Sequence, residues 1–145
     1  MAAGPSSLPL RVLLVSENMP PQVNGIARRC KHYVDGLRSL GCVVDVLDPY
    51  REDRVFGHAN PWNFSALMMV IKPWAFCEIL GGAFDVVHVV MPLNITGIWL
   101  IAAFKLRRLL RREFTPALVV SWHCNLGAYN ALIFPAWANG LMERL

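Results

Sequence analysis

The chain has 145 residues, of which 55% are hydrophobic and 17% are charged, and this balance excludes a disordered protein or an acidic tail. At this length we expect one folded domain, because no polar stretch is long enough to link two. Residues 105–113 carry a net charge equal to the formal +4 of the whole chain, so the rest is neutral. A basic cluster can bind an anionic membrane surface or a phosphate ligand as well as nucleic acid. The chain has no nucleic-acid-binding motif, so we expect no nucleic-acid partner.

The first third of the chain predicts a strand, a helix and a second strand. Residues 1–9 are a Pro- and Ser-containing lead that we expect to be flexible, and residues 11–16 are an aliphatic run typical of a buried parallel strand. From Ile26, apolar residues recur at helical spacing until Gly41 provides a stop. Residues 42–47 then form the second strand, so this unit predicts a parallel pair joined by a helical crossover.

The remainder of the chain continues the alternation of strands and helices. The pattern predicts, in order, a polar loop over residues 50–61, a mostly helical segment over residues 62–80 that breaks near Pro73, a strand over 85–90, a helix over 96–110, a strand over 117–122 and a helix from Ala128 onward. Strands that alternate with helices in this way predict an α/β fold with a Rossmann-like, doubly wound parallel sheet.

The sequence also bears on location. Residues 86–104 and 114–142 lack charged side chains over lengths that could cross a bilayer, but prolines and polar residues interrupt both, so we expect no spanning helix. The first ten residues have neither a charged segment nor an apolar core, so we expect no secretory signal and no secretion. The cytoplasmic face of a membrane and a plastid both fit these features.

The cysteines form no CxxC pair, and each lies among apolar neighbours. We therefore expect no metal site or redox motif, and buried, reduced thiols that act as small hydrophobic side chains. The four are Cys30, Cys42, Cys77 and Cys124.

Ligands of doubly wound folds bind beyond the carboxyl ends of the parallel strands. The chain has neither G-x-G-x-x-G nor a P-loop motif, so nothing predicts a nicotinamide cofactor or a P-loop triphosphate site. The loop after the first strand ends in Asn24-Gly25 at a helix start, where unpaired backbone N–H groups and the helix dipole favour a phosphate. The alternative is that Asn24 only caps the helix and Gly25 only eases the turn.

Three further polar residues lie in or directly after predicted strands. His123 follows the last one, at the edge where ligands dock, although a polar ring in this position is also common as a structural residue. We expect structural roles for His88, which lies between valines, and for Asp48, which begins a turn. The arginines of the basic helix pair at i, i+4 spacing and by default form a solvated face.

A resemblance to a known family rests on three segments. Residues 15–26, Val-Ser-Glu-Asn-Met-Pro-Pro-Gln-Val-Asn-Gly-Ile, with the following helix and its Leu-Gly end, resemble the N-terminal signature of the family-4 retaining glycosyltransferases of the GT-B fold. Residues 85–88 with Pro92, and residues 121–123, match later landmarks of that family in order and approximate spacing. The chain is most similar to the branch with the sulfoquinovosyltransferases and the GDP-mannose-dependent α-mannosyltransferases, over about residues 10–135.

The resemblance implies that residues 10–145 are the N-terminal, acceptor-side half of a GT-B fold. The C-terminal donor domain, with the family's Glu-x7-Glu element, would lie outside this chain, so the isolated fragment is expected to be inactive. The implied reaction transfers a sugar, with retention, from a nucleotide-sugar donor to a lipid or glycan acceptor, as in sulfoquinovosyldiacylglycerol synthesis. No metal or other cofactor is implied.

The resemblance also implies roles for individual residues. Gly25, next to Asn24, would hold the donor diphosphate through its backbone N–H, and His123 would contact the transferred sugar as the catalytic residue. Family members often have His-Thr where this chain has His123-Cys124, which leaves the neighbour's role open. Contact with an anionic membrane would involve Arg107, Arg108, Arg111 and Arg112. The alternative function is a non-catalytic α/β module that binds a phosphate or a small ligand.

Overall fold

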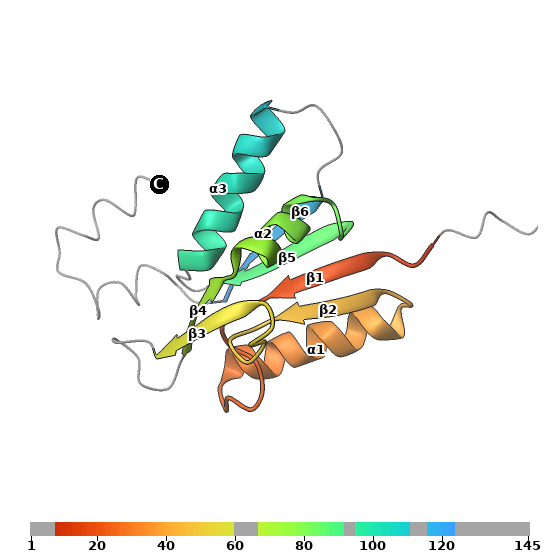
Figure 1. Cartoon of the computed structure of the whole chain (residues 1–145). Helices are drawn as coiled ribbons and strands as arrows, with labels where there is room; N and C mark the ends of the chain where they lie inside the picture. Colours follow the sequence, from red (N-terminus) through yellow and green to blue (C-terminus); the bar gives the residue numbers. More distant parts are fainter. Residues whose placement is uncertain (1–7, 60–66, 92–94, 111–115, 124–145) are drawn as a thin grey trace, which may run out of the picture.

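A computed structural model describes residues 8–59, 67–91, 95–110 and 116–123 (Figure 1). The described residues contain a parallel sheet of order β2-β1-β5-β6. Its strands are β1 (Arg11–Val15), β2 (Val43–Leu47), β5 (Val86–Met91) and β6 (Ala117–Trp122). The helices are α1 (Gly25–Ser39), α2 (Pro73–Leu80) and α3 (Ile95–Leu110).

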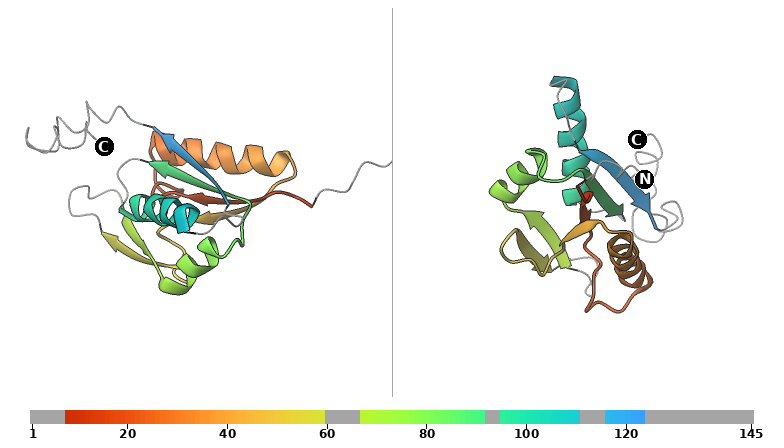
Figure 2. Two further views of the ribbon diagram at one scale, coloured as in Figure 1. Left: turned by 90° about the horizontal axis from the view of Figure 1, so that it is seen from above. Right: turned by 90° about the vertical axis from the view of Figure 1, so that its right-hand side faces the viewer.

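Helices cover both faces of this sheet, which gives the Rossmann-like α/β arrangement predicted from the sequence. α1 lies on one side and α2 on the other (Figure 2). Successive side chains of β1 point to opposite faces of the sheet. Leu13 and Val15 pack in the core cluster that contains Leu100 of α3, whereas Leu14 packs in the cluster that contains Val34 of α1. Apart from α2, whose expected helical segment began at residue 62, these strands and helices are confirmed to within one residue of their expected bounds.

The chain reverses its direction of winding at the centre of the sheet. β1 pairs with β2, reached through α1, and on its other side with β5, where Leu14 lies opposite His88. The helix after β1 covers one face and the helix after β5 covers the other. The carboxyl ends of β1 and β5 therefore flank a topological switch point, the usual place for a ligand in such folds.

The loop expected over residues 50–61 is confirmed for residues 50–54 but is wrong for residues 55–59, and the helical expectation is wrong for residues 67–71. The structure has two antiparallel strands there, β3 (Val55–Ala59) and β4 (Leu67–Ile71). Val55 and Met69 are buried whereas Phe56 and Val70 are exposed, which is the two-residue alternation of a half-buried hairpin. A short apolar run does not distinguish strand from helix by periodicity. The break at Pro73 and the helix from there to Leu80 were predicted correctly. Residues 60–66 lie outside the described part.

The cysteines only partly meet the expectation of buried thiols. Cys30 is buried on α1, with its Sγ 3.4 Å from the Ser16 Oγ, and Cys42 is half-buried. Cys77 is exposed, so the expectation is wrong there. α2 buries Ala75 and Ile79, and a residue midway between them points away because each residue turns the helix by about 100°. Cys124 and the helix expected from Ala128 lie outside the described residues.

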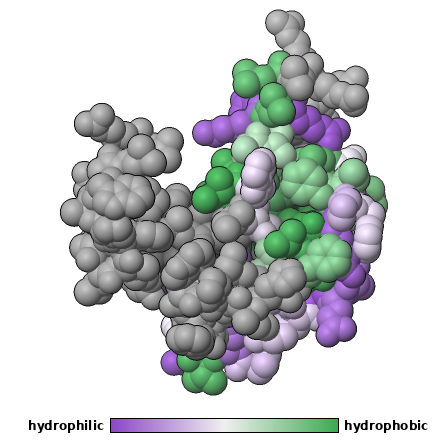
Figure 3. All heavy atoms as spheres, turned by 60° about the vertical axis from the view of Figure 1, so that its left-hand side comes forward, coloured by the Kyte–Doolittle hydropathy of each residue, from purple (hydrophilic) through white to green (hydrophobic). Residues whose placement is uncertain are grey.

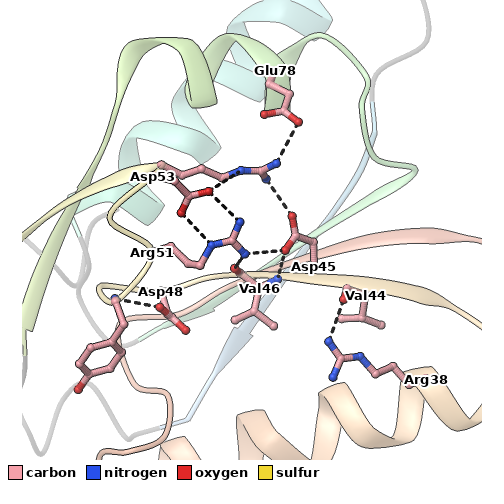
Figure 4. A network of polar contacts seen from close by, with 10 residues as sticks. Arg38, Val44, Asp45, Val46, Asp48, Arg51, Asp53 and Glu78 are labelled. Carbon is pink, nitrogen blue, oxygen red and sulfur yellow. Dashed lines mark hydrogen bonds and ion pairs between the residues drawn. The ribbon is translucent and has the colours of Figure 1, made fainter.

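A network of charged side chains ties β2 to the following turn and to α2 (Figure 4). The Asp45 carboxylate accepts hydrogen bonds from Arg51 Nη1 and Arg54 Nη1, each at 2.9 Å. Arg51 also holds both oxygens of Asp53 at 3.0 Å, and Arg54 reaches Glu78 Oε1 of α2 at 3.2 Å. Asp45 is thus shared by two guanidinium groups, so its loss would disrupt the whole network.

We expect Asp45→Ala to lower the free energy of unfolding by about 1–2 kcal/mol, because two partly buried guanidinium groups lose a common partner. Urea unfolding at low and high salt measures this, and the loss should shrink as salt rises. Asp35→Ala is the control, since its pair with Lys31 is exposed on α1. Equal effects of the two substitutions would contradict a role for the network.

Candidate functional site at the carboxyl edge of the sheet

The loop from β1 to α1 is fixed by side chains that bond back onto it. Gln22 Nε2 donates to the Glu17 carbonyl at 2.8 Å, and the Pro20–Pro21 peptide bond is cis. The Asn24 Oδ1 accepts the Ala27 N–H at 2.8 Å, and its amide nitrogen donates to Asn18 Oδ1 at 3.0 Å. Asn24 is therefore the N-cap of α1, and its side chain is occupied by the fold itself.

The backbone at the start of α1 remains available to a ligand. A helix supplies no partners for its first N–H groups, here those of Gly25 and Ile26, and the N-terminus carries a partial positive charge. A Cβ built onto Gly25 would meet no atom within 4 Å. Neither packing nor backbone conformation requires glycine here, so the space beside Gly25 is open to a close backbone contact with an anion.

The structure brings His123 from the end of β6 to the second and third turns of α1. Its Nδ1 lies 2.8 Å from Nη1 of Arg29, one helical turn beyond Gly25, and its ring centroid lies 5.8 Å from that of Tyr33. Its Nε2 is buried and has no hydrogen-bond partner in the described part of the chain. Burial and the nearby Arg29 charge both lower the pKa of His123 below its ordinary value of 6.5.

His88 and Asp48 have the structural roles expected for them. The His88 Nε2 hydrogen-bonds with the Ser121 hydroxyl of β6, and its ring lies 5.5 Å from that of Tyr33. Burial, and then the charge of His123, lower the pKa of His88. The Asp48 Oδ1 accepts the Tyr50 N–H at 2.9 Å and so closes a turn, and burial raises the pKa of Asp48.

Glu17 is a residue of this edge that the sequence analysis did not single out. It lies two residues after the end of β1, yet it is only 7% exposed. Its Oε1 accepts one long bond of 3.4 Å from the Met69 N–H of β4, and the Thr96 hydroxyl of α3 donates to the Met69 carbonyl. Burial raises the pKa of Glu17 from 4.5 to about 7, and the bond from Met69 only partly opposes this. The available signal was an acid immediately after a buried strand.

Together these residues form a donor-rich edge. The start of α1 offers backbone N–H groups, Arg29 offers a cation and His123 offers a ring nitrogen. Among the residues the structure describes, no three His, Cys, Asp or Glu side chains gather closely enough to hold a metal ion. No helix in the described ranges is both long and apolar enough to span a membrane.

Comparisons of the chain with protein-family models, curated proteins and solved structures found no match. Any proposal for the function of the chain therefore depends on its sequence motifs and on the geometry of this edge of the sheet.

Proposed function

We propose that the chain is the acceptor-side half of a retaining glycosyltransferase of the GT-B fold, which moves a sugar from a nucleotide-sugar donor to a lipid-linked or glycan acceptor. One observation carries the proposal: the Arg29 contact holds His123 beside the helix whose first N–H groups have no partners within it. A nucleotide sugar joins a diphosphate directly to a sugar, so its recognition needs an anion site and a sugar-binding group side by side. The resemblance of residues 15–26 supports the same reading.

The implied mechanism is electrostatic and positional. Backbone N–H groups at Gly25 would stabilise the diphosphate as negative charge develops on it during departure. His123 would orient the sugar, which reduces the entropic cost of reaching the transition state. The rest of the donor would be held by a second half, and retention at the anomeric carbon follows from the family resemblance alone.

A non-catalytic module that holds a phosphate at α1 is the competing function, because the same N–H groups would serve it. The reading frame beyond Leu145 separates the two cheaply. A second α/β half with Glu-x7-Glu favours the transferase, and an immediate stop codon favours the module.

The enzymatic test is a donor screen with the chain and any second half that its reading frame encodes. UDP-sulfoquinovose, UDP-glucose and GDP-mannose are each offered with diacylglycerol, and the product is analysed for its anomeric configuration. We expect one donor to yield a glycolipid with the donor's configuration, and His123→Ala to abolish its formation. Binding of all three donors without transfer would favour the module.

A lipid acceptor would bring the domain to a membrane, and α3 has features that support this. Leu106 and Leu109 are 57% and 83% exposed, and Arg107 and Arg108 lie beside them in the last turn. Figure 3 shows apolar and hydrophilic surface side by side at the top of the molecule, where α3 lies in Figure 1. Arg111 and Arg112 lie outside the described residues.

We expect the chain to co-sediment with vesicles of phosphatidylcholine and phosphatidylglycerol, but not with phosphatidylcholine alone. Each basic residue near an anionic surface contributes about 1 kcal/mol, so changing Arg107 and Arg108 to Gln together should weaken binding roughly 30-fold. Arg28→Gln, on the exposed face of α1, is the matched control. Binding that is indifferent to anionic lipid, or to these two arginines, would contradict this contact.

A further inference from the structure

The hydrogen bond between Arg29 and His123 has a direction that chemistry fixes. A guanidinium carries only donors, so across the 2.8 Å from Nη1 the Nδ1 of His123 must accept. A neutral imidazole carries one proton, and with Nδ1 accepting, that proton lies on Nε2. The contact therefore selects one of the two neutral tautomers.

The selected proton has no acceptor within the described residues. Nε2 of His123 is buried and unpartnered there, and a buried donor without a partner destabilises the folded state. A ligand that displaces the atoms covering Nε2 would supply the missing acceptor.

The surroundings of the ring also disfavour its charged form. Arg29 and Tyr33 face it from α1, and His88 lies on the adjoining strand β5. None of these groups is a carboxylate, and the guanidinium opposes a second positive charge. The lowered pKa of His123 agrees with this geometry.

We propose that Arg29 is a positioning residue that fixes His123 in its Nε2–H tautomer, so that the neutral ring donates a hydrogen bond to a ligand oxygen. In the proposed function, on which the identity of the ligand rests, that oxygen is a hydroxyl of the transferred sugar. His123 is then a neutral donor near pH 7, rather than an acid or base that exchanges protons with the substrate.

The test is long-range ¹H–¹⁵N spectroscopy of the ¹⁵N-labelled chain between pH 5 and 8, which reports the tautomer and the titration of each imidazole. We expect wild-type His123 to have a protonated Nε2 and an unprotonated Nδ1. Arg29→Ala should give a mixture of tautomers and a higher titration midpoint. Arg29→Lys keeps a charged donor and should restore much of the wild-type pattern, and Arg28→Ala should change nothing.

A protonated Nδ1 in the neutral wild-type ring would overturn the positioning role, and so would Arg29→Ala spectra that match those of Arg28→Ala. Arg29 is exposed, so its variants are expected to fold, and amide dispersion checks this in the same samples. UDP-glucose and GDP-mannose form a separate arm, offered to the chain together with any second half that its reading frame encodes, and here the Nε2–H signal should move downfield. If it moves with neither donor, the ligand contact and the proposed function fail, while the tautomer result stands independently.

Discussion

Replacing Glu17 by Gln is expected to raise the free energy of unfolding at pH 7.5 by about 3 kcal/mol, and by less than about 1 kcal/mol at pH 5. The cause is the buried carboxyl, whose pKa rises from 4.5 to about 7 in the folded chain. Between these values the folded state binds more protons than the unfolded state. The stability that the protonated group contributes is therefore complete below pH 4.5 and is lost as the pH rises through about 7. Gln stays neutral throughout and keeps an oxygen for the Met69 N–H.

Urea unfolding of wild type and variant across pH 4.5–8 measures this difference. Wild type should lose stability over the range, and Glu17→Gln should lose markedly less. Glu52→Gln removes an exposed carboxylate and is expected to keep the wild-type dependence. Parallel curves for wild type and Glu17→Gln would show that the carboxyl is not held in a buried, neutral form.

Gly25→Ala is expected to weaken the binding of UDP-glucose or GDP-mannose at least tenfold while leaving the fold intact. The new methyl group has room in the free chain, since no atom lies within 4 Å of it, but it occupies the space through which a phosphate would approach the backbone. Stability should be unchanged or up to about 1 kcal/mol higher, because alanine restricts the unfolded chain more than glycine does.

The matched control is Gly36→Ala on the same helix. A Cβ there also meets nothing within 4 Å, and the position is exposed and far along α1 from its N-terminus. We expect Gly36→Ala to stabilise the helix by about 1 kcal/mol and to leave donor binding unchanged. Titration calorimetry measures the affinity of both variants for UDP-glucose and GDP-mannose. Equal affinities of Gly25→Ala and Gly36→Ala would show that the start of α1 is not part of the donor-binding site.

Much of the fold could be predicted because its strands are continuous aliphatic runs separated by a helix of clear period. The run at residues 11–15 and the helical spacing from Ile26 each specify one element and one orientation. The β3–β4 hairpin could not be predicted in this way. Its alternation becomes visible only when Val55 and Met69 are known to face the core, which is a fact of tertiary packing.

The candidate site also combines residues that local sequence identifies with residues that only tertiary contacts reveal. Gly25 was identified because it begins a recognisable helix and His123 because it directly follows a recognisable strand, and the carboxyl ends of parallel strands meet at one edge. The hydrogen bond between Arg29 and His123 joins residues 94 positions apart in sequence, so no local sequence pattern predicts it. The burial of Glu17 likewise depends on β4, the element whose conformation was predicted wrongly.

The most direct measurement is an amide and imidazole ¹H–¹⁵N titration of the chain, together with any second half that its reading frame encodes, with UDP-glucose and GDP-mannose and with inorganic sulfate as the comparison anion. If the diphosphate binds at the start of α1 and the sugar beside His123, a nucleotide sugar should shift the signals of Gly25, Ile26 and His123 Nε2 together, with one shared affinity. Sulfate should shift the two amides with little effect on the imidazole. Nucleotide sugars that leave Gly25 unmoved, or that move it without His123, would contradict a shared site for these two residues.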